Sequence, residues 1–400
     1  MKPLSNIVRL SALALVAALA VSCGKTDPQP KVQPALRLRT NPAPAAGGTQ
    51  FLDVTASGDW TLTVEGGTWA AVEPDHGTGS IAVIFKYERN DGAVARTVRM
   101  ILKAGNGEVS VDFTQNGSTV SPPSPGSIAG TDVAPVRWLE LPETKAGDGL
   151  EFFAHRMDFE GRSVRNYSFD WDYENRISHW VAYPMISAYA RKGTDRTDVW
   201  GLDPLLPAAK QQMLIDPATG KGKSYRDGDD GWRSRGHQLP SADRLFSYDA
   251  NVSTFYGTNM TPQDNDFNGG IWVVLENAVR NWAKRSDTAY VVTGCFGDTG
   301  HYVLDFANNR ITVPQGYYKA VVCKLSGSPG FGAGGYAGCA ICFDDVNHRP
   351  KESLKNFAMS IDDLEKKLGM NLFVNLPDAI GKEKAGQVEA ENPQTVSWWW

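Results

Sequence analysis

Gly231-Trp-Arg-Ser-Arg-Gly-His237 and Asn259-Met-Thr-Pro-Gln263 are the two stretches around which the second half of this chain is organised. In the first stretch, His237 follows Arg235 by two residues. Side chains two positions apart in an extended strand point to the same face. We therefore expect the imidazole and the guanidinium to share one face of a strand.

The residues after the second stretch have helical spacing. Asn268, Trp272 and Glu276 follow one another at intervals of four. In a helix, Asn268 and Glu276 would lie about 80° apart, so both could face one site. An imidazole, an amide and a carboxylate interleaved with arginines could surround one divalent cation and one phosphate diester.

Composition indicates a globular chain of more than one domain. The 400 residues are 42% hydrophobic and 21% charged. A formal net charge of -5 provides no general attraction for polyanions. Any nucleic-acid binding must therefore depend on a local cluster of arginine and lysine, which argues against a DNA-coating protein and leaves catalysis open.

Residues 1–23 have the pattern of an export signal. Lys2 and Arg9 precede an apolar run, residues 10–21, that is too short to cross a bilayer comfortably. The small residues before Cys23 complete the pattern. We expect an exported protein and no transmembrane helix at this end.

Cys23 follows Ala20-Val-Ser22 and resembles the processing site of a bacterial lipoprotein, with Leu19 one position further back than usual. The resemblance implies a lipid on Cys23 and anchorage in the cell envelope, at the periplasmic face or the cell surface. Residues 24–35 would then be a flexible tether. The alternative is a signal peptide that is cleaved without lipidation.

Residues 36–117 alternate between apolar and polar side chains in short runs separated by Gly, Asp and Asn. This period of two predicts an all-β sandwich. The predicted strands lie within residues 50–54, 60–64, 80–85, 97–102 and 109–113. Because the stretch has one histidine, His76, and no clustered ligands, we expect it to contribute no catalytic group.

The same stretch resembles the sandwich module called BACON, found on surface and periplasmic proteins of the Bacteroidetes. The resemblance rests on Gly58-Asp-Trp60, Trp69, Asn90 with Arg96, and Phe113-Thr-Gln-Asn-Gly117. It implies contact with glycans, on which Trp60 and Trp69 would stack. Both tryptophans could instead be core residues of a small sandwich, and we favour that interpretation, with the module as a spacer.

Residues 118–135 are rich in proline and serine and are predicted to be a semi-stiff linker. The second domain, residues 136–381, mixes strand and helix patterns and is predicted to be α+β. Residues 382–400 are expected to be a polar tail whose terminal tryptophans have no companion apolar run. The expected strands are 176–184, 289–295 and 317–324, and the expected helices are 271–285 and 360–368, the last with Ser360 as N-cap.

The second domain resembles the DNA/RNA non-specific endonuclease family, whose members carry a ββα-metal, or His-Me finger, site. The resemblance rests on residues 225–227, 231–240, 259–263 and 267–268 with Trp272 and Glu276, and extends to residues 180–183, 313–319, 360–365 and 373–377. It implies a metal-dependent endonuclease that hydrolyses DNA and RNA with little sequence preference. Mg²⁺ is the implied cation, with Mn²⁺ as the alternative.

The resemblance also implies a role for each candidate residue. His237 would be the general base, and the carbonyl oxygen of Asn268 would bind the cation. Glu276 would hold a water of that cation, while Arg235 and, from the preceding loop, Arg196 would bind the phosphate. The alternatives are a structural His237, a helix N-cap at Asn268 and a plain surface carboxylate at Glu276.

Ser234 departs from the family pattern, in which an aspartate is usual at this position. The departure puts the support of Arg235 or His237 in doubt but removes no ligand or base. The competing hypothesis is a cell-surface glycan-binding lipoprotein whose nuclease-like domain is degenerate. We expect Asn259 and Gln263 to brace the turn and not to touch substrate.

Four cysteines, Cys295, Cys323, Cys339 and Cys342, lie in the second domain. Exported proteins meet oxidising conditions, so at least one disulfide is expected, with a metal site or free thiols as alternatives. The sequence does not choose the pairing and does not indicate an oligomeric state.

Overall fold

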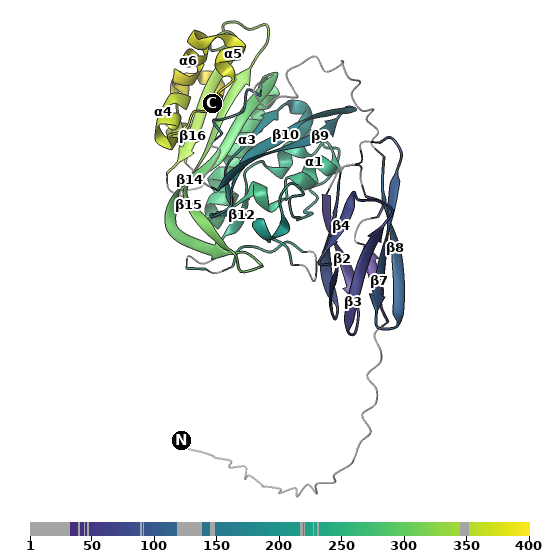
Figure 1. The fold of residues 1–400 in the computed structure, drawn as a ribbon. Coiled ribbons are helices and arrows are strands. Elements are labelled where there is room, and N and C mark those ends of the chain that lie inside the picture. The colour runs from purple at the N-terminus through teal and green to yellow at the C-terminus, as the bar shows by residue number, and fades with distance from the viewer. Residues whose placement is uncertain are drawn as a thin grey trace, which may run out of the picture. The chain divides into compact units, whose positions relative to one another are not determined.

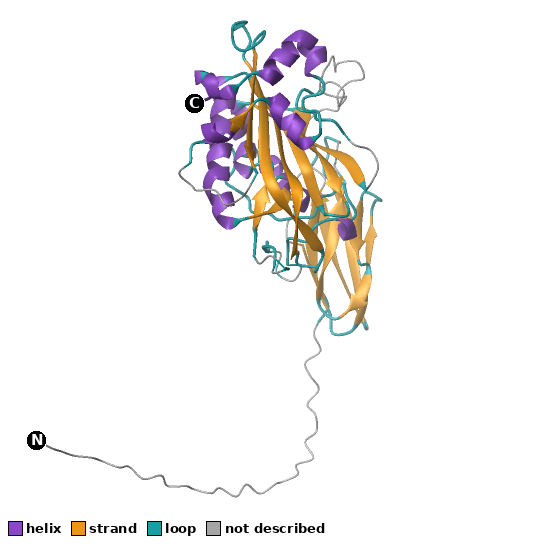
Figure 2. Cartoon of the chain, turned by 90° about the vertical axis from the view of Figure 1, so that its left-hand side faces the viewer, coloured by secondary structure: helices purple, strands orange, loops and turns teal. Residues whose placement is uncertain are grey.

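Strands account for more of the described chain than helices do, and the α-helices of this part all follow residue 247 (Figures 1 and 2). The computed structural model describes residues 33–38, 41–43, 45, 48–88, 90, 92–117, 138–144, 149–216, 219, 221–226, 228–229, 232–344 and 352–400. The predicted signal segment with Cys23 and the linker at 118–135 lie outside these residues. None of the described helices has the length and apolar content needed to cross a bilayer.

Two antiparallel sheets of four strands each form the described part of the first domain. The first has the order β1 (Ala35–Leu38), β2 (Gly48–Thr55), β6 (Ile81–Tyr87), β4 (Ala70–Glu73), and the second has the order β5 (His76–Thr78), β3 (Asp59–Glu65), β7 (Arg96–Ala104), β8 (Gly107–Gln115). One apolar core, which includes Leu52, Phe85 and Phe113, joins the two sheets. The all-β prediction for this stretch is confirmed.

Trp60 and Trp69 differ in their packing. Trp60 is buried in the core, and its Nε1 donates a hydrogen bond to the carbonyl of Gly79 at 2.9 Å. Trp69 is half-buried, packs 6.2 Å from the ring of Phe113, and carries the guanidinium of Arg96 at 4.0 Å from its ring centroid. The interpretation of both residues as packing residues therefore fits the structure, with Trp69 at the edge of the core.

A seven-stranded antiparallel sheet is the frame of the second domain as described. Its order is β17 (Ala358–Met359), β16 (Tyr336–Phe343), β15 (Arg310–Lys324), β14 (Thr288–Leu304), β11 (Ile177–Met185), β10 (Arg162–Asp172), β9 (Leu150–Phe159). The three predicted strands are confirmed in β11, β14 and β15. The α+β prediction for this domain is also confirmed, because helices pack on both faces of the sheet (Figure 2).

Different helices pack on the two faces of this sheet. On one face, Tyr317 and Val321 of β15 share a core with the helix α3 (Val273–Arg285). On the other, Tyr318 and Val322 share a core with α4 (Ile361–Leu368), α5 (Leu376–Ile380) and α6 (Lys382–Ala390), which lie together beside β16 (Figure 1). Burial on both faces explains the nearly continuous apolar run of β15.

The helix predicted at 360–368 is confirmed as α4, with the hydroxyl of Ser360 accepting a hydrogen bond from the backbone of Asp363 at 3.1 Å. The remaining short elements are α1 (Tyr248–Ser253) and single helical turns. These turns are Ser187–Ala190, Ala208–Lys210, Ser241–Arg244, Gly257–Asn259, Leu354–Phe357, Pro393–Thr395 and Ser397–Trp399.

The residues after 381, expected to be a polar tail, pack against the second domain. They form α6 and two short turns, and Trp399 is buried. The indole of Trp282 on α3 donates to the carbonyl of Trp399 at 2.9 Å, and the two rings meet edge to face at 4.9 Å. Trp399 thus packs on a helix that is more than a hundred residues away in the sequence. The pattern of neighbouring residues could not predict this contact.

The disulfide prediction is wrong for this structure: Cys295, Cys323, Cys339 and Cys342 are all described, and all are free buried thiols. Cys339 pairs with Val321 and not with Cys323, so the two cysteines are diagonal neighbours across β15 and β16. Diagonal side chains lie about 7 Å apart, beyond the reach of about 3.8 Å between the Cβ atoms of a disulfide. The side chain of Cys342 belongs to the core on the other face of the sheet from Cys323 and Cys339. Cys295 lies on β14, and β15 separates it from the two cysteines of β16.

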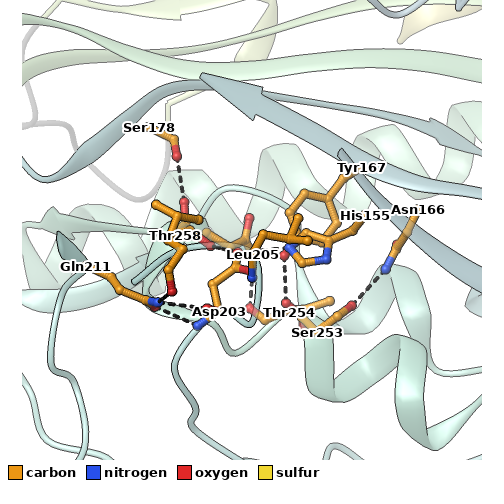
Figure 3. Close-up of polar contacts among 12 residues, drawn as sticks. His155, Asn166, Tyr167, Ser178, Asp203, Leu205, Gln211, Ser253, Thr254 and Thr258 are labelled. Carbon is orange, nitrogen blue, oxygen red and sulfur yellow. Dashed lines mark hydrogen bonds and ion pairs between the residues drawn. The ribbon is translucent and has the colours of Figure 1, made fainter. Parts of the chain in front are cut away.

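A buried polar cluster fixes the long excursion between β11 and β12 (Ser234–His237) to the sheet (Figure 3). The carboxylate of Asp203 bonds to His155 Nε2 of β9 at 2.8 Å and accepts from the hydroxyl of Thr258 at 2.6 Å. Its backbone N–H donates to the side chain of Gln211 at 2.6 Å, and Gln211 donates back to its carbonyl at 2.7 Å. Because Asp203 is only 1% exposed, these bonds have no competition from water.

We predict that Asp203→Ala lowers the free energy of unfolding by about 2–5 kcal/mol, since His155 and Thr258 lose a buried partner. The measurement is calorimetric or denaturant unfolding of the full chain. The control is Asp195→Ala, which removes an exposed carboxylate paired with exposed Lys192 and should leave the transition unchanged. An unchanged transition in Asp203→Ala would show that the cluster contributes no stability.

Candidate active site

The first motif lies on a two-stranded antiparallel ribbon of β12 and β13 (Met260–Gln263). A Cβ at Gly236 would lie 2.1 Å from the side-chain carbon Cδ of Gln263. The glycine therefore allows Gln263 to pack across the ribbon. This placement agrees with the prediction that Gln263 supports the ribbon.

Asn259 braces the chain on both sides of the ribbon, as predicted. Its side-chain oxygen accepts from the backbone of Leu239 at 2.8 Å. Its amide nitrogen donates to the carbonyls of Leu239 and Thr254 at 2.9 and 2.8 Å. Asn259 is completely buried, so these bonds fix the end of β12 where the histidine lies.

His237 ends β12 among aromatic rings and is 9% exposed. The rings of Phe255 and Trp200 meet the imidazole edge to face, with centroid distances of 5.1 and 5.9 Å. Its Nε2 is buried and has no hydrogen-bond partner among the residues described. The hydrogen-bonding capacity of this nitrogen is therefore not used by any described residue.

Burial lowers the pKa of His237 well below its ordinary value of 6.5, and the positive charges of Arg196, Arg235 and Lys319 lower it further. The imidazole is therefore neutral at pH 7 and is protonated only in more acidic solution. A neutral imidazole is the form that a general base requires.

The two candidate arginines lie on the same pair of aromatic rings. The guanidinium of Arg235 is 3.5 Å from the ring centroid of Trp200, and that of Arg196 is 4.7 Å from the ring of Phe255. Arg196 also donates to Ser241 at 2.7 Å and pairs with Asp198 at 2.8 Å. The structure thus places both guanidiniums around His237.

Asn268 is not the N-cap of a helix. Asp264 is the N-cap of the short helix α2 (Asn265–Phe267), and its carboxylate accepts from the backbone of Asp266 and Phe267. Asn268 instead begins a π-helical turn, Asn268–Trp272, that leads into α3. No described residue bonds to its half-exposed side chain, so the carbonyl oxygen remains available for a ligand. The capping alternative is excluded.

The helix expected over residues 271–285 is present, with a π-helical turn up to Trp272 and α3 after it, but it does not continue without a break back to Asn268. Gly270 has a non-helical backbone, with φ -105° and ψ -111°, and α3 begins only at Val273. The angle of about 80° between Asn268 and Glu276 assumed an uninterrupted helix and no longer applies. Turns of this kind are frequent at functional sites.

Glu276 lies in the first turn of α3 and is half-buried. Burial raises its pKa to about 7, while the ammonium of Lys319 opposes this shift. Lys319 is 1% exposed and donates to the carbonyl of Gln238 and the hydroxyl of Thr293, both at 2.9 Å. Glu276 is therefore not a plain surface carboxylate.

Reasoning from the sequence assigned no function to four residues that lie near the site: Trp200, Phe255, Lys319 and Asp243. Asp243 pairs with Arg280 of α3 at 2.6 Å and is completely buried. Lys319 belongs to residues 313–319, one of the stretches on which the family resemblance rests. This was the one sequence signal that could have pointed to Lys319 as a site residue. Trp200 and Phe255 act through contacts between distant segments, which spacing does not show.

Ser234, where the family pattern has an aspartate, donates from its hydroxyl to the side-chain oxygen of Asn265. This bond joins β12 to the first residue of α2. The serine therefore retains a structural link between the strand with His237 and the segment with Asn268.

The donors present fit a hard divalent cation that keeps most of its water. An uncommitted amide oxygen at Asn268 and a carboxylate at Glu276 are the oxygen ligands that Mg²⁺ accepts. Within the described residues no group of three or more His, Cys, Asp or Glu side chains could hold a metal ion, which excludes a zinc-type site there.

The domain that carries this site is a nuclease domain by sequence. The chain belongs to the DNA/RNA non-specific endonuclease family, whose sequence pattern matches residues 149–379, more than half of the 400 residues. A nuclease of Serratia marcescens is 30% identical over 207 residues, 51% of this chain and 71% of that protein. A nuclease of Nostoc sp. is 28% identical over 221 residues, 54% of this chain and 74% of that protein. The human mitochondrial nuclease EXOG is 26% identical over 229 residues, 54% of this chain and 58% of that protein.

We predict that Arg196→Met moves the acidic limb of the pH profile of kcat/KM to higher pH. The positive charge of Arg196 lowers the pKa of both His237 and Glu276, so its removal raises both values and both groups are protonated at higher pH. The control is Arg191→Met, which removes an exposed arginine paired with Glu160. A limb that stays in place in Arg196→Met would contradict this electrostatic coupling.

Proposed function

We propose that this protein is an exported, Mg²⁺-dependent endonuclease that hydrolyses DNA and RNA with little sequence preference. The observation that carries the proposal is the buried Nε2 of His237, which lacks a described partner and belongs to a ring packed on Trp200 and Phe255, the two rings that hold Arg235 and Arg196. Most buried polar atoms have a hydrogen-bond partner. An unpaired nitrogen beside two arginines fits a base that takes a proton from a water molecule at a phosphate diester.

In the proposed reaction, His237 Nε2 takes the proton of a water molecule whose oxygen attacks the phosphorus. Arg235 and Arg196 bind the non-bridging oxygens of the phosphate by charge-assisted hydrogen bonds. The bond between phosphorus and the departing sugar oxygen then breaks. These contacts address the backbone of the nucleic acid and not its bases, which accounts for low sequence preference.

Asn268 would bind the cation through its side-chain oxygen, and Glu276 would hold one of its waters. When bound, Mg²⁺ supplies positive charge that stabilises the crowded phosphate oxygens and the leaving oxygen. Burial raises the pKa of Glu276 and the ammonium of Lys319 lowers it, so Lys319 favours the ionised form of this carboxylate. Mn²⁺ is the alternative cation, since it accepts the same oxygen ligands.

We predict that His237→Ala and Asn268→Ala fail in different ways. Loss of the base should lower turnover on DNA and RNA by about 10² to 10⁴ at every Mg²⁺ concentration. Loss of the cation ligand should produce a deficit that shrinks as Mg²⁺ is raised. The measurement is cleavage of plasmid DNA and RNA across a Mg²⁺ titration, with chelator as the blank.

His301→Ala is the matched control, because His301 is a half-exposed histidine of the same domain and should be dispensable. Wild-type activity in His237→Ala at saturating Mg²⁺ and about pH 8 would refute the mechanism. Absence of cleavage by the wild type would favour the competing hypothesis of a glycan-binding lipoprotein with a degenerate nuclease domain.

We further propose that the first domain is a BACON-like spacer and that a lipid on Cys23 anchors the chain in the cell envelope. The support is the residue pattern before Cys23 and the packing of Trp60 and Trp69 within the sandwich. Contact with glycans through this module is the weaker alternative, because Arg96 covers a face of Trp69.

The anchor predicts that Cys23→Ser moves the protein from the membrane fraction to the soluble fraction of cells that express the full chain. The physical reason is the loss of the acyl chains that hold a lipoprotein to a bilayer. Immunoblots of the separated fractions measure the shift. Membrane retention of the variant would exclude lipidation at Cys23 as the anchor.

A further inference from the structure

Arg235 lies in a slot formed by an aromatic ring and by bare backbone at the edge of that ring. Its guanidinium is 3.5 Å from the ring centroid of Trp200. At the edge where the two side chains meet is Gly222, where an added Cβ would lie 2.1 Å from Nη1 of Arg235 and 2.4 Å from Cδ1 of Trp200. Only a glycine leaves room for both side chains.

In this slot the guanidinium of Arg235 is contacted by an aromatic ring and not by a described carboxylate. Nη1 of Arg235 is buried and bonds to no described residue, and Arg235 is absent from the ion pairs of the described part, in which Asp198 pairs with Arg196. A carboxylate would occupy the in-plane N–H groups, whereas an aromatic ring attracts the cation from above its plane. The N–H groups of Arg235 therefore remain available for a phosphate.

Trp200 also sets the position of Arg235 relative to the base. Its ring contacts the imidazole of His237 at 5.9 Å and the ring of Phe255 at 5.1 Å. Asp203, three residues further along the chain, is fixed by the buried polar cluster described above. The ring is therefore held by rigid neighbours on several sides.

We propose that Trp200 is a positioning residue that acts through Arg235: the slot of Trp200 and Gly222 holds the guanidinium flat, with its N–H groups directed to the scissile phosphate. This inference rests on the proposed function, in which Arg235 binds that phosphate. The slot supplies orientation, and no atom of Trp200 takes part in the chemistry.

A double-mutant cycle on the full chain tests the slot. Trp200→Leu should lower kcat/KM on DNA by about 2- to 30-fold, the value of a cation–π contact, while Trp200→Phe should retain activity within about threefold. In the Arg235→Ala background, Trp200→Leu should cause no further loss, because its effect passes through Arg235. Gly222→Ala, whose added methyl would collide with both side chains where they meet, should behave like Trp200→Leu.

Affinity for a labelled DNA duplex, measured by fluorescence anisotropy in chelator, provides a second readout that needs no turnover. Trp200→Leu should weaken DNA binding, measured as Kd, in the wild type and should have no further effect in the Arg235→Ala background. Because Kd is measured without turnover, this result separates an error in the proposed role of Trp200 from an error in the proposed nuclease activity. Trp69→Leu is the matched control, since it removes a tryptophan under Arg96 in the sandwich at a similar distance, and it should change neither readout. Additive losses for Trp200→Leu and Arg235→Ala, or full activity of Gly222→Ala, would overturn the proposal.

Discussion

The hydrogen bond from the indole of Trp272 to the carbonyl of His237, at 3.2 Å, joins the two halves of the site. One half is β12, which ends at His237, and the other is the π-helical turn that begins at Asn268. Lys319 strengthens the same junction, because its ammonium lies 4.5 Å from the ring of Trp272 and donates to the carbonyl of Gln238. The central sheet therefore determines where the base and the amide oxygen lie relative to each other.

This junction also explains how an acidic chain can present a site for polyanions. The net charge is -5, yet Arg196, Arg235 and Lys319 all act on His237. Aromatic rings surround these groups and exclude water, and charges interact more strongly where the local dielectric is low. A few cations close to His237, of which Lys319 is fully buried, can thus outweigh a distant negative surface, whose effect salt screens within about 10 Å.

The sequence predicted those features that local spacing determines. Period-two runs indicated the sandwich and the central strands, and the motif around His237 indicated the strand that carries the base. Features that depend on contacts between distant segments were missed. The strand register keeps Cys323 and Cys339 apart, Trp282 covers the end of the chain, and Gly269-Gly270 breaks the helix before α3. Only the arrangement in space brings Trp200 beneath Arg235.

The energetic cost of the site bears on whether the domain is a degenerate nuclease. Nε2 of His237 and Nη1 of Arg235 are buried without a described partner, and burial raises the pKa of Glu276 to about 7. Each unpaired buried group costs about 1–3 kcal/mol, a large fraction of the stability of a domain. Substitutions that remove such groups would stabilise the fold, and a domain without activity would be free to accept them. Ser234, where the family pattern has an aspartate, forms a bond to Asn265. The unpaired groups of His237 and Arg235 are therefore the costly part of this site, and Ser234 is not.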